Sequence, residues 1–120
     1  SRVCETYPKL QLIVGHLGES LPFSLWRIDR SMSRGGKRKV PFRDLFCEHF
    51  YITTSGNFST PSFQCALAMV GIDRILFSAD YPFESNKDAA DWFDALPIAE
   101  SDKLKIGRTN ANRLFKLGMS

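Results

Sequence analysis

Residues 10–15 read LQLIVG, a nearly continuous apolar run that is rich in branched side chains and ends at a glycine. Such a run is typical of a strand buried on both faces, as in a parallel sheet. Two more segments have strand composition, 51–55 (YITTS) and 74–79 (RILFSA). Helical patterns separate and follow them, so the sequence predicts an α/β fold in which strands and helices alternate.

Helix signals lie between the strands and after the last one. Apolar residues recur at helical spacing over about 22–31, and a short helix is expected behind Pro41. Thr60 and Pro61 are expected to be the N-cap and first residue of a helix that stops at Gly71.

The last strand is followed by further helices. Ser85 with Asp88 resembles a capping box, and Pro97 ends the helix that it opens. The tail is expected to form two short helices that meet at Gly107, with Thr109 capping the second.

The strand ends, near His16, Ser55 and Asp80, are spaced close to the roughly 30 residues per strand–helix unit of a (β/α)₈ barrel. Three parallel strands cannot close a barrel, and alone they would leave two edges unpaired. The chain also begins at Ser1, without a methionine. We therefore expect residues 1–120 to be the C-terminal part of an incomplete TIM barrel, namely its last three strand–helix units and C-terminal helices. The alternative is a complete three-layer domain.

Composition excludes several classes of protein. The 120 residues are 43% hydrophobic and 24% charged, as in globular proteins, and no apolar stretch approaches the roughly 20 residues of a membrane span. The three cysteines have neither disulfide-framework nor zinc-site spacing, so a cytoplasmic location is expected. In the basic stretch 30–43, no aromatic residue stands among the charges of residues 30–39, which favours a solvated loop over nucleic-acid binding.

Reactive groups of parallel α/β folds gather at the carboxyl ends of the strands. His16 ends one strand, and Glu19 lies three residues later, where its carboxylate could fix the imidazole tautomer and raise its basicity. Alternatively, Glu19 is a helix N-terminal acid and His16 a satisfied polar residue; the spacing leaves both open. His49 lies on an apolar helical face and is expected in the core or an interface.

Asp80 follows the third strand directly and precedes Tyr81 and Pro82. A turn cap is one explanation. However, a carboxylate that leaves a buried strand must be paired or bound to metal, and with a nearby imidazole it is half of a divalent-metal site. The other ligands would have to come from outside these residues.

Four stretches resemble, in order, the last three units and tail of the non-oxidative aromatic acid decarboxylases of the amidohydrolase superfamily. They are 12–23 (LIVGHLGESLPF), 50–58 (FYITTSGNF), 74–84 (RILFSADYPFE) and 106–117 (IGRTNANRLFKL). The resemblance is closest to the 2,3-dihydroxybenzoate decarboxylases, with the γ-resorcylate (2,6-dihydroxybenzoate) decarboxylases next. It implies a carboxy-lyase that releases CO₂ from an o-hydroxybenzoate.

The resemblance also implies roles for particular residues. Asp80 corresponds to a catalytic metal ligand, and the substrate is a small aromatic carboxylic acid. His16 and Glu19 are the other catalytic residues implied, and Phe23, Arg27 and Phe83 would contact the substrate. The metal is expected to be divalent, zinc first and magnesium or manganese otherwise, with no organic cofactor, and the parent protein is expected to be a homodimer or homotetramer.

The first-strand Glu-x-His and the fifth-strand histidine of the family have no counterpart here, so this chain is not expected to hold the full metal site. Two alternatives remain. One is metal-assisted hydrolysis on the same fold, and the other is a truncated, non-catalytic chain that only associates with partners.

Overall fold

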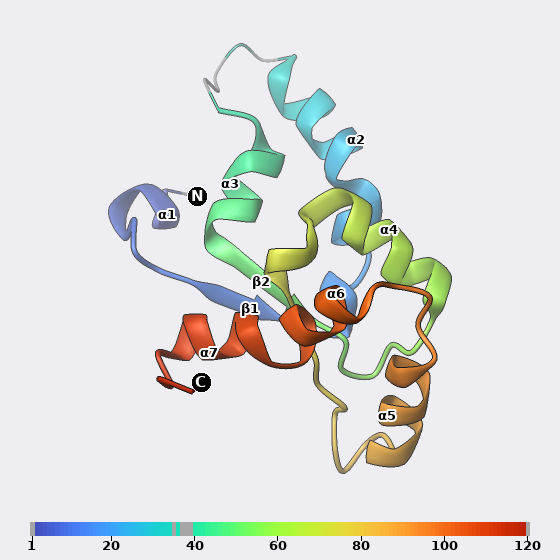
Figure 1. Ribbon diagram of the computed structural model, residues 1–120. Coiled ribbons are helices and arrows are strands. Elements are labelled where there is room, and N and C mark those ends of the chain that lie inside the picture. Colours follow the sequence, from blue (N-terminus) through green and yellow to red (C-terminus); the bar gives the residue numbers. More distant parts are fainter. Residues whose placement is uncertain (1, 35, 37–39, 120) are drawn as a thin grey trace.

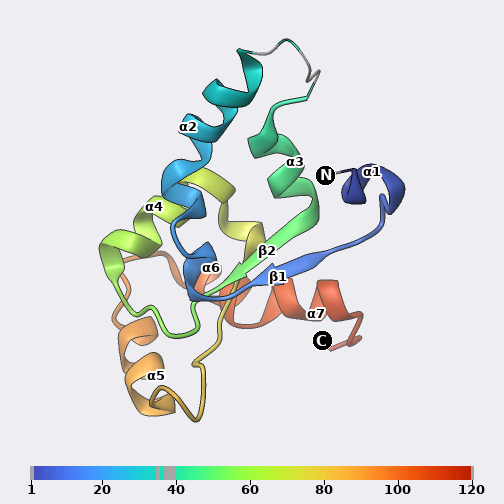
Figure 2. The same cartoon turned by 180° about the vertical axis from the view of Figure 1, so that it is seen from behind.

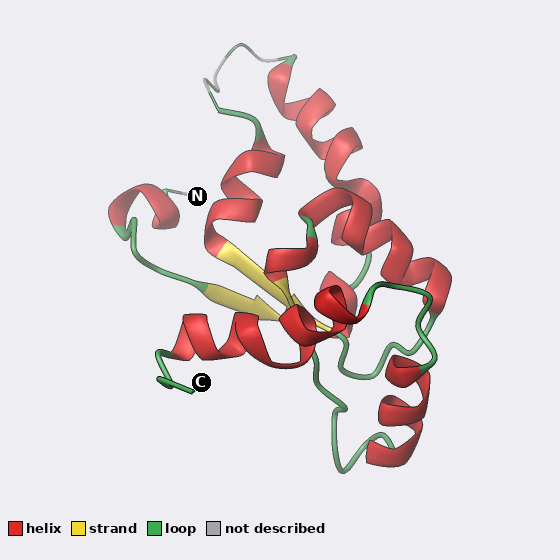
Figure 3. Cartoon of the chain, in the orientation of Figure 1, coloured by secondary structure: helices red, strands yellow, loops and turns green. Residues whose placement is uncertain are grey.

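A short parallel sheet forms the centre of the computed structural model, which describes residues 2–34, 36 and 40–119. Its strands are β1 (Leu12–Val14), β2 (Phe50–Thr53) and β3 (Ile75–Leu76), in the order β1-β2-β3. Both pairings are parallel, with Leu12 opposite Phe50 and Ile52 opposite Ile75. The predicted parallel α/β arrangement is therefore confirmed, although each strand is shorter than its apolar run (Figure 3).

Helices surround this sheet. Figures 1 and 2 show α2, α3 and α4 grouped on one side of the strands and α7 on the other. The helical elements are α1 (Val3–Thr6), η1 (His16–Gly18), α2 (Leu21–Ser33), α3 (Phe42–His49), α4 (Thr60–Val70), η2 (Ile72–Arg74), α5 (Asn86–Asp94), α6 (Glu100–Leu104), η3 (Lys105–Thr109) and α7 (Asn110–Phe115). No helix in the described part of the chain is long and apolar enough to cross a membrane.

The hydrophobic core lies between the sheet and its helices. It contains Leu17, Leu25, Phe46, Ile52, Phe63, Ala66, Val70, Ile75, Leu96 and Ile106. β2 and β3 contribute the fully buried Ile52 and Ile75 to it, but on β1 the side chains of Leu12 and Ile13 are 37% and 45% exposed. The prediction that this first strand is buried on both faces is wrong for this chain, because β1 is an edge strand whose apolar side chains are incompletely covered by the described residues.

Two helix starts test the predicted caps. The capping interaction of α5 is confirmed, since Ser85 Oγ accepts the Asp88 N–H at 3.2 Å. The cap of α4 was placed one residue too late: Ser59 Oγ accepts the Ser62 N–H at 3.5 Å. The hydroxyl of Thr60 instead accepts from Trp92 Nε1 at 3.2 Å, which joins α4 to α5.

The predicted break at Gly107 is wrong. α6 continues through the π-helical segment η3 into α7 without leaving right-handed helical backbone, and Thr109 makes no capping hydrogen bond. A hydrogen bond to the sheet explains the wider, π-helical turn of η3. The carbonyl of Ile106 accepts the Phe77 N–H at 3.0 Å just after β3, so the helix bonds to the sheet at this point.

The basic stretch lies partly outside the described residues, since Lys37, Arg38 and Lys39 are among those not described. Arg34, directly after α2, and Arg43, near the start of α3, are exposed.

Asn110 fastens the C-terminal helix to the sheet. Its side chain is fully buried, and Nδ2 donates to the carbonyl oxygens of Ile72 and Ile75 at 2.8 Å each.

Asn110→Ala would leave both acceptors unsatisfied, so we expect it to lower the free energy of unfolding by about 2–4 kcal/mol in urea denaturation. Asn86→Ala, at the exposed start of α5, is the matched control and should change it little. Equal effects would contradict this role.

Candidate functional site

Three strand ends meet at one edge of the sheet, and two of them carry the charged residues singled out above. His16 follows β1, and Asp80 lies four residues beyond β3. His16 Nδ1 lies 2.7 Å from Glu19 Oε1, and His16 Nε2 lies 3.2 Å from Asp80 Oδ2. Of the two alternatives that the spacing leaves open, the structure shows the contact between Glu19 and His16. Asp80 joins it to form a Glu19–His16–Asp80 chain of contacts.

An unusual backbone turn produces the first of these contacts. His16, Leu17, Gly18 and Glu19 all have positive φ, at 51°, 55°, 75° and 56°. A left-handed turn of this kind is strained for residues other than glycine, and it returns the Glu19 carboxylate to the imidazole of His16. Asp80 is also left-handed, with φ 83°. Such strain clusters at functional sites and persists only where surrounding contacts enforce it.

The two ring nitrogens of His16 both face carboxylate oxygens, and this arrangement constrains the protons. A carboxylate only accepts hydrogen bonds, so both contacts are hydrogen bonds when the imidazole carries two protons or when one carboxyl is protonated. The hydrogen bonds that His16 makes to Glu19 and, second, to Asp80 raise the pKa of His16, although desolvation opposes them. The two carboxylates therefore favour the protonated form of the His16 imidazole.

The segment that follows β2 forms hydrogen bonds with the segment that leads from β3 to Asp80. The buried hydroxyl of Thr54 donates to Ser78 O at 2.8 Å and accepts the Ser78 N–H at 3.0 Å, which fixes the chain leading to Asp80. The sequence places Thr54 and Ser55 at the end of the predicted strand 51–55 and indicates no role for Gly56. A Gly-Asn pair after a strand indicates only where the strand stops, and no local pattern indicates that Gly56 faces His16.

The three weaker candidates lie at the surface. Phe23 and Phe83 are 82% and 83% exposed, and the backbone N–H of Phe83 donates to Asp80 O at 2.9 Å. Arg27 is exposed on α2 and makes no ion pair or hydrogen bond with the described residues. The structure therefore does not bring these three side chains into contact with the His16–Asp80 pair.

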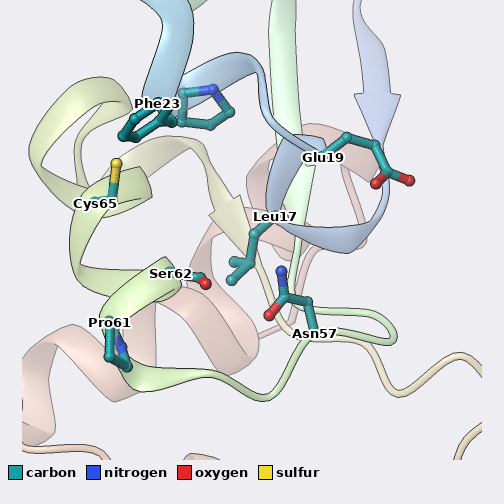
Figure 4. Close-up of a pocket in the computed structure, with 8 residues that line it drawn as sticks. Leu17, Glu19, Phe23, Asn57, Pro61, Ser62 and Cys65 are labelled. Atoms are coloured by element: carbon teal, nitrogen blue, oxygen red, sulfur yellow. The ribbon is translucent and has the colours of Figure 1, made fainter.

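A cavity of about 330 Å³ opens beside Glu19. Figure 4 shows that its walls come from η1, α2, α4 and the loop after β2. Its lining includes Leu17, Glu19, Phe23, Asn57, Ser62 and Cys65. Phe23 thus shares a concave surface with one member of the contact chain.

His49, by contrast, is a core residue. It is 3% exposed, and its Nδ1 lies 3.0 Å from Leu10 O. The prediction that it belongs to the core rather than the site is confirmed.

The donors of this site suit a divalent cation only in part. Asp80 offers a carboxylate, a hard oxygen ligand, while both nitrogens of His16 already face carboxylates. Among the described residues, no group of three or more His, Cys, Asp or Glu side chains could hold a metal ion. A cation at Asp80 would therefore need further ligands from outside the described residues.

Comparison with known proteins adds independent information. Residues 1–117 match the protein-family model described as Amidohydrolase. The chain is 50% identical over 125 residues to a γ-resorcylate decarboxylase of Rhizobium sp. (strain MTP-10005), and the match covers 98% of the chain but 37% of that relative. The chain therefore spans less than two fifths of this relative's length.

Solved structures agree with this match. A 2,6-dihydroxybenzoate decarboxylase from Rhizobium superposes with a TM-score of 0.89 at 50% identity, over 97% of this chain and 38% of that one. A dihydroxybenzoic acid decarboxylase from Polaromonas sp. JS666, solved with manganese and the inhibitor 2-nitroresorcinol, gives 0.89 at 48% identity, over 98% and 37%. The arrangement of β1, β2 and β3 is thus shared with these structures.

The hydrogen bonds of His16 make its titration testable. We expect an NMR titration in chelator to give a His16 pKa above the ordinary 6.5, and Glu19→Gln to lower that pKa because it removes the largest cause of the shift. The stabilising contribution is then complete below pH 6.5 and is lost as pH rises through the raised pKa. Glu5→Gln, on exposed α1, is the control. An unchanged pKa in Glu19→Gln would contradict the assignment.

Proposed function

Because the chain belongs to the amidohydrolase family, we propose that the intact protein containing it is a metal-dependent, non-oxidative decarboxylase of an o-hydroxybenzoate. The observation that carries this proposal is the Glu19–His16–Asp80 contact chain at the strand ends, in a sequence half identical to a γ-resorcylate decarboxylase. The names of these relatives favour 2,6-dihydroxybenzoate as the substrate, in place of the expected 2,3-isomer.

We further propose that residues 1–120 form the C-terminal part of a (β/α)₈ barrel. Two observations support this arrangement: the match covers 37% of the relative, and the apolar side chains of β1 are partly exposed at the sheet edge. Strands elsewhere in the barrel would cover them. A homodimer or homotetramer and a cytoplasmic location remain predictions.

Asp80 is proposed as a metal ligand, and the remaining ligands would come from the rest of the barrel. The manganese in the Polaromonas relative supports a divalent ion and favours manganese over the zinc first expected. When bound, such an ion supplies positive charge that orients the substrate's carboxylate and ortho hydroxyl and stabilises negative charge that develops there.

The residues of this chain then handle the protons. Asp80 delivers a proton, drawn from its contact with His16 Nε2, to the ring carbon that bears the carboxylate. Protonation interrupts aromaticity; the bond to the carboxylate then breaks, CO₂ leaves, and the bonding electrons restore the aromatic ring. His16, held by Glu19, accepts the phenolic proton and so increases the electron density of the ring.

Phe23, Phe83 and Arg27 are proposed substrate contacts. The two exposed aromatic rings would form walls for a flat aromatic acid, and the Arg27 guanidinium would attract its carboxylate. They require segments of the barrel outside this chain to complete a closed pocket, which agrees with their exposure.

A substrate panel tests the proposed reaction. We expect the intact protein to release CO₂ from 2,6-dihydroxybenzoate faster than from 2,3-dihydroxybenzoate, and not from benzoate, which lacks the ortho hydroxyl. Released CO₂ and the phenolic product would be measured together, alongside a lactone and an amide as hydrolase substrates. Ring-opened acid without CO₂ would instead favour the hydrolase. Absence of every product, with no stoichiometric metal and partner-dependent sedimentation, would favour a non-catalytic chain.

Asp80 is the residue on which both metal binding and proton delivery depend. We expect Asp80→Asn to lower bound manganese, measured by mass spectrometry of the metal, and to lower the rate of CO₂ release by at least about 10²–10⁴-fold. The amide keeps the shape but loses the charge and the proton. Asp88→Asn, on the exposed first turn of α5, should leave both unchanged. Unchanged turnover in Asp80→Asn would refute the role.

A further inference from the structure

Gly56 lies directly against the His16–Asp80 pair. A Cβ placed on it would lie 2.7 Å from Cδ2 and 3.0 Å from Nε2 of His16, and 3.0 Å from Oδ2 of Asp80. Real Cβ atoms essentially never lie as close to another atom as 2.7 Å, and 3.0 Å is unusually tight. Any residue but glycine would therefore displace the ring, the carboxylate or both. The glycine therefore sets how closely the two groups approach.

Ser55 holds the His16 side of the pair. Its hydroxyl oxygen accepts the backbone N–H of His16 at 3.2 Å and lies 2.8 Å from the hydroxyl of Thr53. Ser55 itself is buried, at 8% exposed, and the hydrogen bond is partly buried. It ties the strained left-handed backbone of His16 to the end of β2.

The same segment holds the Asp80 side. The Gly56 N–H donates to Ala79 O at 3.3 Å, one residue before Asp80. Consecutive residues of one segment thus fasten the two halves of the site, Ser55 toward His16 and Gly56 toward Asp80.

We propose that Ser55 and Gly56 are positioning residues, which keep His16 Nε2 and Asp80 Oδ2 within hydrogen-bond distance so that a proton can pass between them. Neither residue needs to touch the substrate. The expected effect on kcat rests on the proposed decarboxylase function. The expected effect on the distance between His16 Nε2 and Asp80 Oδ2 does not.

Gly56→Ala in the intact protein tests this proposal. Two glycines provide matched controls, because Gly71 (φ 83°) and Gly118 (φ 65°) share a positive φ with Gly56 (φ 63°) but have no atom within 4 Å of an added Cβ. Gly71→Ala and Gly118→Ala therefore report backbone strain alone, and Gly56→Ala adds the steric clash.

The crystal structure of Gly56→Ala should show the His16 Nε2 to Asp80 Oδ2 distance lengthened beyond about 3.5 Å, with both controls unchanged. We expect kcat to fall about 100-fold and KM to change far less, since a misplacement of this size affects the reacting geometry more than binding. An unchanged distance, or an unchanged kcat in an active enzyme, would overturn the proposal. If the wild-type protein releases no CO₂, the proposed function fails, but the distance still decides the positioning role.

Ser55→Ala tests the same positioning role if Gly56→Ala does not fold. Loss of one hydrogen bond should lower kcat about tenfold and accelerate amide hydrogen exchange at His16. Ser31→Ala, on the exposed distal part of α2, should do neither. Unchanged exchange at His16 in Ser55→Ala would overturn the proposal, whatever the activity.

Discussion

The close approach of His16 and Asp80 over Gly56 is the constraint on which the site depends. The two residues are 64 positions apart in the chain and meet only because β1, β2 and β3 are parallel neighbours whose carboxyl ends lie at one edge. β2 stands between the other two strands, so the segment that follows it can contact both. A register change of one residue along β2 would move Gly56 away and place a side chain between the ring and the carboxylate.

Sequence-based predictions succeeded where the local pattern of residues matches the structure that the residues adopt in the folded chain. Strand composition located β2 correctly, and the Ser85 cap was recognisable because its partner lies only three residues away. The contact of Glu19 with His16, also three residues apart, was one of two alternatives that the spacing allowed. The contact of Asp80 with His16 depends on sheet order, which no local pattern specifies, and so only a shared strand-end position could be predicted.

The failures have a common physical origin in tertiary contacts. Gly107 looked like a helix break because glycine favours helix ends, but the bond from Phe77 to the Ile106 carbonyl and the burial of Asn110 stabilise a continuous helix. Apolar composition placed β1 in an interior, yet Leu12 and Ile13 are partly exposed in this chain. The apolar composition of β1 therefore suits a strand that is buried in the intact protein. In the proposed barrel, strands outside residues 1–120 would cover it.

Glu19 and Asp80 contact different nitrogens of His16, and in the proposed metal-dependent site the two carboxylates have different roles. A cation at Asp80 would withdraw negative charge from that carboxylate and weaken its hold on His16. Glu19 is the larger cause of the raised pKa of His16, and its contact is the shorter of the two, at 2.7 Å. In the proposed enzyme, Glu19 thus maintains the proton affinity of the imidazole independently of the metal, which leaves Asp80 able to bind a cation and exchange a proton at the same edge of the sheet.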